Sequence, residues 1–105
     1  MAQFSVHLNG NPHTAADIPY LLDVQTDLLA DLATRVVVPL YHAEVMAGKV
    51  VGTLMPTLVI DGQPLVMVTP QLAGVANKLL GPPVADLSDQ RDIVIAALDL
   101  LITGI

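Results

Sequence analysis

Residues whose side chains commonly do chemistry are few in this sequence, and their spacing matches no catalytic arrangement. The two serines, Ser5 and Ser88, both lie outside Gly-rich segments. A nucleophilic serine of the hydrolase type sits in a sharp Gly-rich turn between a strand and a helix, which exposes its hydroxyl. Cysteine is absent, so thiolate nucleophiles, disulfides and cysteine-based zinc sites are excluded together. The sequence therefore predicts no nucleophile.

The histidines and glycines predict neither a metal nor a cofactor. His7, His13 and His42 do not have the short, regular spacing of metal ligands. The glycines are scattered and form no Gly-rich phosphate loop. With one Phe, two Tyr and no Trp, the chain also lacks a stacking platform for nucleic-acid bases. We expect no cofactor and no metal.

Three carboxylates, Asp23, Asp27 and Asp31, are spaced four residues apart. On a helix they would share one face, but aspartates so spaced more often form turns and helix caps than an acid/base pair. We therefore assign no catalytic residue. The chemistry-bearing residues indicate a small binding or interaction protein instead of an enzyme.

The length and composition predict one domain that associates with other subunits. The chain has 105 residues and a mass of 11.0 kDa, so residues 1–105 form a single domain. Charged residues make up 13% and apolar residues 53%, and a monomer this small cannot cover that much apolar surface. The net charge of -6 repels phosphate, so nucleic acid is not an expected partner.

The sequence shows no feature of an exported or membrane protein. Its first residues lack a basic segment followed by an apolar run. The longest uninterrupted apolar run, residues 93–98, is six residues long, far short of the roughly 20 that span a bilayer. We expect a soluble cytoplasmic protein with no membrane partner.

Alternation and β-branched residues predict several strands. Residues 3–8 alternate polar and apolar side chains, and residues 20–24 resume an extended pattern after a loop. Residues 35–40 include three consecutive valines, which predict a strand with both faces buried. A turn is expected near residues 27–33.

An antiparallel hairpin is predicted around Asp61-Gly62, because this dipeptide tolerates the positive φ values of a tight turn. Its strands would be residues 57–60 and 65–68. Pro64 has no N–H to donate, so it should lie at an edge or at the start of its strand. Thr69-Pro70-Gln71 is expected to begin a short helical turn.

The C-terminal segment predicts a helix from about Asp89 to Ile102, capped by Asp86 or Ser88. Its apolar residues occupy far more than one stripe, so it needs cover on more than one side. One side can be the sheet of its own subunit, and the other is best explained by the same helix of a partner across a two-fold axis. The residues assigned to this dimer interface are Ala97, Leu98 and Leu101.

Several blocks of the sequence together resemble the CcdB family of plasmid and chromosomal toxins. The blocks lie in the family's order and are Leu22–Leu29 (LDVQTDLL), Arg35–Leu40 (RVVVPL), Pro56–Ile60 (PTLVI), Val84–Ser88 (VADLS) and the tail Gly104-Ile105. They cover nearly the whole chain. The resemblance implies a mainly β fold with a C-terminal α-helix: a homodimeric SH3-like barrel of antiparallel strands of the CcdB/MazF type, with a small second sheet and the helix at the dimer centre.

The resemblance also implies what the protein does. Toxins of this family pair with a CcdA antitoxin and poison DNA gyrase by docking their last residues on the dimerisation region of the gyrase A subunit, with no bond-making residue of their own. Carried over by position, the gyrase-binding residues would be Ile102, Thr103, Gly104 and Ile105. The best-known members have tryptophan in place of Thr103, and losing its stacking surface for a guanidinium removes about 1 to 2 kcal/mol of binding.

The antitoxin of this family wraps a disordered C-terminal segment around the toxin dimer. By the same carry-over, the antitoxin-binding residues would be Thr26, Leu28, Leu29, Asp99 and Ile102. The residues alone leave Leu28 and Leu29 open to a second interpretation as core residues of a turn.

Two other functions fit the same family type. One is a non-toxic dimer that only binds antitoxin and regulates transcription of its operon, since toxicity depends on a few surface residues. The other is an endoribonuclease of the related MazF type, which needs basic and polar residues to bind RNA. Four basic residues in an acidic chain argue against the ribonuclease.

Overall fold

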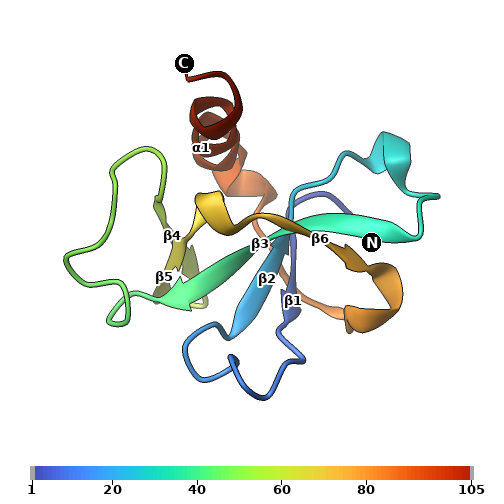
Figure 1. Ribbon diagram of the computed structural model, residues 1–105, viewed down its shortest axis with the longest axis horizontal. Helices are drawn as coiled ribbons and strands as arrows, with labels where there is room; N and C mark the ends of the chain where they lie inside the picture. Colours follow the sequence, from blue (N-terminus) through green and yellow to red (C-terminus); the bar gives the residue numbers. More distant parts are fainter. Residues whose placement is uncertain (1, 105) are drawn as a thin grey trace.

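The computed structural model describes residues 2–104 (Figure 1). Within this range the fold is a curved, half-barrel antiparallel sheet of seven strands with one α-helix at the C-terminal end. The elements are β1 (Ser5–Leu8), β2 (Tyr20–Asp23), β3 (Thr34–His42), β4 (Thr57–Ile60), β5 (Gln63–Met67), β6 (Ala73–Ala76), β7 (Pro83–Asp86) and α1 (Arg91–Thr103). Four single turns of 3-10 helix connect them: η1 (Asp27–Leu29), η2 (Thr69–Gln71), η3 (Asn77–Leu79) and η4 (Ser88–Gln90). The mainly β class with a C-terminal helix is confirmed.

Strand β3 is the centre of the sheet, and it is the strand with three consecutive valines. One edge pairs with β2 from Val37 to Leu40. Its other edge pairs with β6 along Thr34–Val37 and with β5 along Leu40–His42. Because β6 joins β3, all seven strands form one sheet, and the separate second sheet implied by the family resemblance was wrong for this chain.

The hairpin predicted around Asp61-Gly62 is confirmed. Asp61 has φ 51° and Gly62 has φ 77°, as a two-residue turn of type I′ requires. Pro64 lies opposite Val59 at the start of β5, where the pairing of β5 with β3 has not yet begun. The missing N–H of this proline therefore leaves no gap in the sheet.

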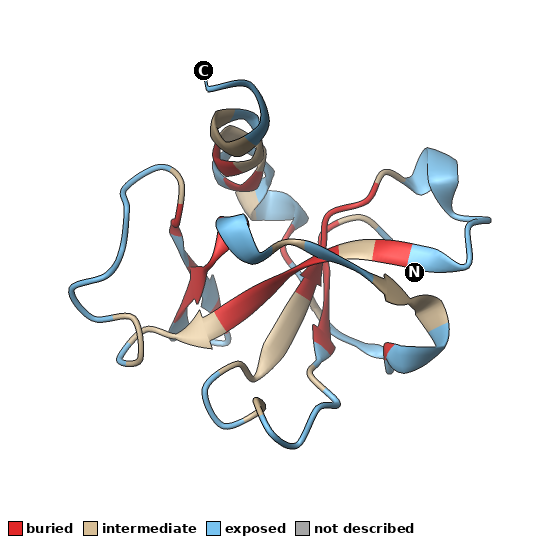
Figure 2. Cartoon of the chain, viewed as in Figure 1, coloured by how far each residue is buried: buried red, intermediate tan, exposed pale blue. Residues whose placement is uncertain are grey.

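The main core lies between the concave face of the sheet and α1. Figure 2 shows the buried residues gathered where β3, β2 and β1 cross below the helix. The helix contributes Val94 and Ala97, and the fully buried members from the strands include Val6, Leu22, Val38, Leu40, Leu58, Leu65 and Met67.

Two strands and the helix start differ from the prediction. β6 (Ala-Gly-Val-Ala) and β7 (beginning with Pro83) lack the residues typical of strands, and pairing with β3 and β1 holds them extended. Residues 88–90 form the 3-10 turn η4 ahead of α1, so the helix begins at Arg91. The expected cap by Asp86 or Ser88 was wrong, because Leu87 and Gln90 are the N-cap residues of η4 and α1 and neither makes a side-chain cap bond. Asp86 Oδ1 instead accepts from the Ser88 N–H at 2.8 Å, which forms a turn ahead of η4. None of the described helices is long and apolar enough to cross a membrane.

A buried ion pair joins the end of β2 to the start of β3. Arg35 donates from Nε to Asp23 Oδ2 at 2.8 Å and from Nη2 to Asp23 Oδ1 at 3.0 Å. The two side chains are 1% and 0% exposed. Nη2 also donates to the Gln25 carbonyl at 3.1 Å, while Nη1 has no partner. The bidentate pair and the additional main-chain acceptor offset part of the cost of desolvating the two charges. Removing either partner would leave the other charge buried and unpaired.

We predict that Arg35→Met lowers the free energy of unfolding by about 3 to 5 kcal/mol, because Asp23 is left buried and unpaired. Urea unfolding followed by circular dichroism measures this loss. Arg91→Met is the matched control, since Arg91 is largely exposed and pairs with Asp92 only at 3.7 Å. Equal unfolding midpoints for the two variants would show that the buried pair does not stabilise the fold.

Candidate functional site

The Thr26–Leu29 turn is held to the sheet by the side chain of Gln25. Its Nε2 donates to the Leu29 carbonyl at 3.1 Å, and its Oε1 accepts from the Val36 N–H at 3.1 Å. The Gln25 main chain is fixed as well, because its N–H donates to Asp23 Oδ1 at 3.0 Å. The ion pair, Gln25 and the turn thus form one continuous hydrogen-bonded unit.

The turn itself presents an apolar side chain to solvent. Thr26 Oγ1 accepts from the Leu28 N–H at 3.3 Å, and Asp27 Oδ1 accepts from the Gln3 N–H at 2.8 Å. Leu28 is 92% exposed and Leu29 is about half exposed, so neither is a core residue. An exposed leucine on a fixed backbone is a ready anchor for a partner, because little ordering is needed on this side of the contact.

The end of α1 is the second exposed feature. Thr103 Oγ1 donates to the Asp99 carbonyl at 2.7 Å, and the Gly104 N–H donates to the Leu100 carbonyl at 3.1 Å. Gly104 has φ 77°, the left-handed conformation that ends many helices. Ile102 is 71% exposed. Of the residues assigned to gyrase binding, Ile105 lies outside the described residues.

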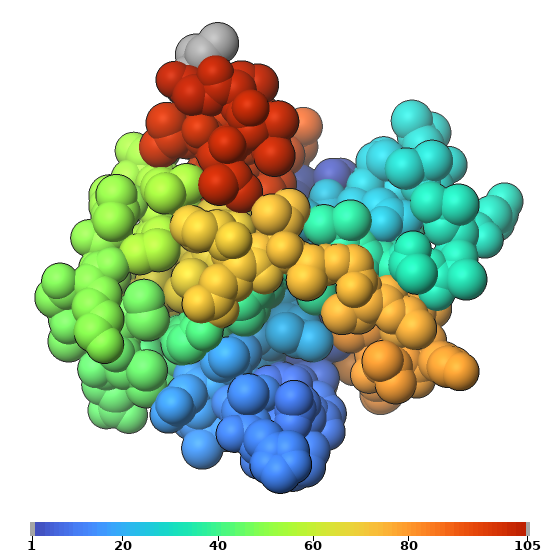
Figure 3. Space-filling model, in the orientation of Figure 1, coloured from blue at the N-terminus to red at the C-terminus, as the bar shows by residue number. Residues whose placement is uncertain are grey.

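The turn and the helix end are separate projections of the molecule. In Figure 1 both rise from the sheet at the top of the view, the helix nearer the centre and the Thr26–Leu29 turn to the right. The space-filling view in Figure 3 shows them as two distinct projections, one red and one cyan. The residues assigned to antitoxin binding therefore lie on both projections: Thr26, Leu28 and Leu29 on the turn, and Asp99 and Ile102 on the helix end.

The residues assigned to the dimer interface lie on the stripe of α1 that faces its own sheet. Ala97 is fully buried within the subunit and has no surface left for a partner, so its assignment is corrected. Leu98 packs against the same core, and Leu101, one turn further, is partly exposed. A second apolar stripe, formed by Ile93, Ala96 and Leu100 at helical spacing, is left partly or fully exposed.

The residues that first suggested chemistry have structural roles or lie apart. His7 is fully buried, with Nδ1 2.7 Å from the Gly81 carbonyl and Nε2 3.0 Å from Ser5 Oγ. The Ser5 hydroxyl donates to the Ala2 carbonyl at 2.6 Å, so it is bonded within the fold. Across residues 2–104, His, Asp and Glu form no group of three that would suit a metal ion.

The three aspartates spaced by four do not share a helix face. Asp23 lies in β2 and pairs with Arg35 of β3, Asp27 lies in η1, and Asp31 is exposed in the following loop. The interpretation as a turn residue holds for Asp27, but Thr26 is the residue that caps this turn, and Asp27 accepts the N–H of the distant Gln3. The interpretation missed the ion pair of Asp23, because pairing across two strands leaves no signal in local spacing.

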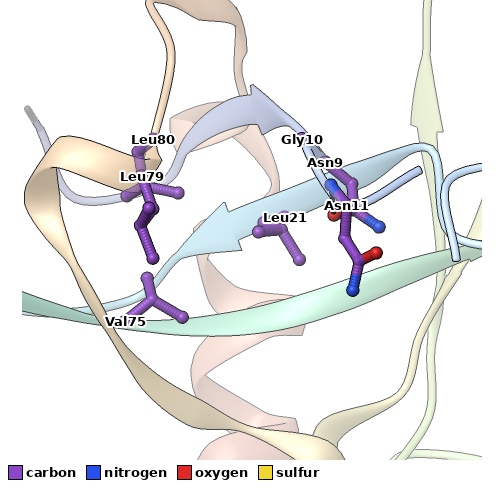
Figure 4. Close-up of a pocket in the computed structure, with 7 residues that line it drawn as sticks. All are labelled: Asn9, Gly10, Asn11, Leu21, Val75, Leu79 and Leu80. Carbon is purple, nitrogen blue, oxygen red and sulfur yellow. Dashed lines mark hydrogen bonds between the residues drawn. The ribbon is translucent and has the colours of Figure 1, made fainter. Parts of the chain in front are cut away.

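A cavity that the sequence did not indicate opens on the outer side of the sheet. Its volume is about 390 Å³. Figure 4 shows Leu79, Leu80 and Val75 on one side, the Asn9–Asn11 segment on the other, and Leu21 between them. Asn9 is fully occupied by the fold, because its amide donates to Thr14 and Ile18 and its oxygen accepts from the Asn11 N–H. The cavity is therefore apolar and has few free polar groups. It is better suited to binding an apolar side chain of a partner than to catalysis.

The described residues present two exposed surfaces, the Thr26–Leu29 turn and the end of α1, where the family resemblance places contacts with partners. The family model described as CcdB protein matches residues 3–104. This match takes in the buried ion pair, the Thr26–Leu29 turn and the helix through Gly104. With nearly the whole chain matched, the protein belongs to the CcdB family, the toxins of toxin–antitoxin modules.

Proposed function

We propose that this chain is a toxin of a type II toxin–antitoxin module that binds the DNA gyrase A subunit and traps the gyrase–DNA cleavage complex in the cytoplasm. The observation that carries the proposal is the end of α1. Ile102 projects into solvent there, and the left-handed Gly104 ends the helix with no side chain in the way. Such an end can approach a partner backbone closely.

The proposed mechanism uses binding energy alone. The toxin inserts its helix end between gyrase subunits after DNA has been cut and so prevents their return to the resealing geometry. A wedge needs an exposed, well-ordered contact and no proton donor or nucleophile. The capped helix end meets that need, because Thr103 and Gly104 both bond back to the helix and hold its last turn.

Homodimerisation is part of the proposal, because a two-fold toxin presents two helix ends to a two-fold gyrase A dimer. The partly exposed stripe of Ile93, Ala96 and Leu100 is the candidate helix contribution to that interface. It runs beside the core-facing stripe, so a partner can cover it without disturbing the packing of Val94 and Ala97.

A CcdA-type antitoxin is the proposed second partner. A disordered segment that orders on binding can cover both the Thr26–Leu29 turn and the helix end, because an extended chain can span the distance between the two projections. Ile102 belongs to both proposed contacts, so antitoxin binding would cover part of the gyrase-binding surface directly.

One observation favours the alternative of a non-toxic, antitoxin-binding regulator. Thr103 stands where the best-known members carry tryptophan, and its hydroxyl is engaged with the Asp99 carbonyl of its own helix. The hydroxyl hydrogen is therefore used within the helix, and the side chain offers gyrase no aromatic stacking surface. Inducible expression with and without the antitoxin separates the two functions by their effect on growth.

We predict that Gly104→Glu abolishes gyrase poisoning with little effect on stability. Glutamate in the left-handed conformation is strained and places a charge at the docking surface, while the position is exposed at the chain end. The assay is purified gyrase with plasmid DNA and ATP, scored for linear DNA after detergent and protease. Deleting Ile105 should have the same effect, and Thr103→Trp should raise the yield of linear DNA.

Gly10→Glu is the matched control for this prediction, because Gly10 is exposed and its neighbourhood is open. It should poison gyrase like the unmodified toxin. Absence of linear DNA at every concentration of the unmodified protein would contradict gyrase poisoning and favour the regulator.

We predict that Leu28→Asp weakens antitoxin binding at least tenfold. Burying a leucine side chain contributes about 1.5 to 3 kcal/mol, and each 1.4 kcal/mol is a factor of ten in affinity. Calorimetric titration with the antitoxin segment measures the change. Leu8→Asp is the control, since Leu8 is an exposed leucine on β1. Equal affinity of both variants would remove the turn from the antitoxin surface.

The neighbouring alanines of α1 test the dimer surface. Ala96→Lys should leave the subunit folded and shift it toward monomer in sedimentation, because Ala96 is partly exposed beside Leu100. Ala97→Lys should instead unfold the subunit, because a charge would enter its core. A folded Ala96→Lys protein that remains dimeric at micromolar concentration would place the interface elsewhere.

A further inference from the structure

The two end strands of the sheet, β4 and β7, border a common slot. The strand order runs from β4 through β5, β3, β2 and β1 to β7, so each end strand has one edge without a neighbouring strand. A cavity of about 270 Å³ is lined by residues 59–61, 84–87, 89 and 90. We call it the β4–β7 slot. It is smaller than the roughly 300 to 1,000 Å³ of sites for compact small molecules.

The β4 side of the slot is occupied by a side chain that imitates a strand. In the hairpin, Ile60 and Gln63 close the turn, so the main-chain groups of Val59 point away from β5. Gln90 meets them: its Oε1 accepts from the Val59 N–H at 3.3 Å, and its Nε2 donates to the Val59 carbonyl at 3.0 Å. A primary amide thus makes the two hydrogen bonds that a neighbouring strand would make.

The β7 side offers matching main-chain groups. The Leu87 N–H donates to the Phe4 carbonyl at 2.9 Å, and alternation along the strand then turns the main-chain groups of Asp86 away from β1. The side chains of Val59 and Val84 are both exposed beside the slot. Two outward-facing strand edges with apolar side chains form a template for an added strand.

Charge around the slot selects the kind of strand. Asp61, Asp86 and Asp89 line it, and none of its nine lining residues is basic. Asp86 uses one carboxylate oxygen to accept from the Ser88 N–H, which leaves the other for a ligand. Arg91 follows in sequence but pairs with Asp92. An extended segment carrying lysine or arginine on one face would match these carboxylates.

We propose that the β4–β7 slot accepts an extended, basic segment of a partner protein as an additional strand, which displaces the Gln90 amide from Val59. The occupant is a different protein, because a second copy of this chain carries the same charge of -6 and has only four basic residues. The proposal does not depend on gyrase binding, since the slot and the helix end share no residue.

The test uses an end-capped peptide of alternating lysine and valine, titrated into the intact protein and followed by amide chemical shifts. Shifts should concentrate at Val59, Ile60 and residues 84–86. The combined variant Asp61→Asn, Asp86→Asn, Asp89→Asn should weaken binding at least tenfold. A control variant with the same change of net charge, Asp17→Asn, Asp31→Asn, Glu44→Gln, should bind nearly as well as the unmodified protein, because these three exposed residues lie outside the slot.

Gln90→Ala supplies the decisive arm, because it removes the competitor for the β4 edge. It should tighten peptide binding severalfold, whereas attraction to a negative surface would not change. Equal loss of binding in the two aspartate variants, weaker binding by Gln90→Ala, or shifts confined to other strands would overturn the proposal. Concentration-dependent association of Gln90→Ala without peptide would also overturn it, since the slot would then take another copy.

Discussion

The ion pair between Asp23 and Arg35 ties together parts of the molecule that otherwise have little in common. It joins β2 to β3 inside the sheet, and its members also hold the main chain of Gln25. Gln25 in turn holds the Thr26–Leu29 turn and the edge of β3. An exposed turn is thereby built on a buried charge pair, whose desolvation is offset in part by the hydrogen bonds that Asp23 and Arg35 make. The arrangement explains why so small a turn can present leucines to solvent without collapsing onto the sheet.

The helix divides its surface between three tasks. Val94 and Ala97 complete the core, while Asp92 and Asp99 face solvent on the opposite side. Between them lies the partly exposed apolar stripe with Leu100, and at the end Gly104 stops the helix. A single helix of 13 residues therefore closes the core and carries the proposed contacts with a second subunit and with gyrase. This concentration of roles fits a chain that has only one α-helix among its described residues.

The parts of the fold that sequence reasoning predicted are those with strong local signals. Three successive valines mark β3, and Asp61-Gly62 marks a type I′ hairpin, because each pattern restricts the backbone by itself. β6 has no such signal, since Ala73-Gly74-Val75-Ala76 becomes a strand only by pairing with β3. Local sequence patterns also could not predict which face of α1 is buried against the sheet. Ala96 and Ala97 are chemically identical neighbours, and only the position of the sheet decides which one is buried.

The pairing of β1 with β7 joins the first strand to the last, so the sheet can be completed only late in synthesis on the ribosome. Ser5 lies opposite Asp86, 81 residues later in the chain. At roughly 5 to 20 residues per second, β1 waits about 4 to 16 s for its second neighbour. The helix that fills the core is made later still, so incomplete chains lack both the closed core and the proposed gyrase contact. The closed core and the end of α1 therefore become available only when synthesis of the chain is nearly finished.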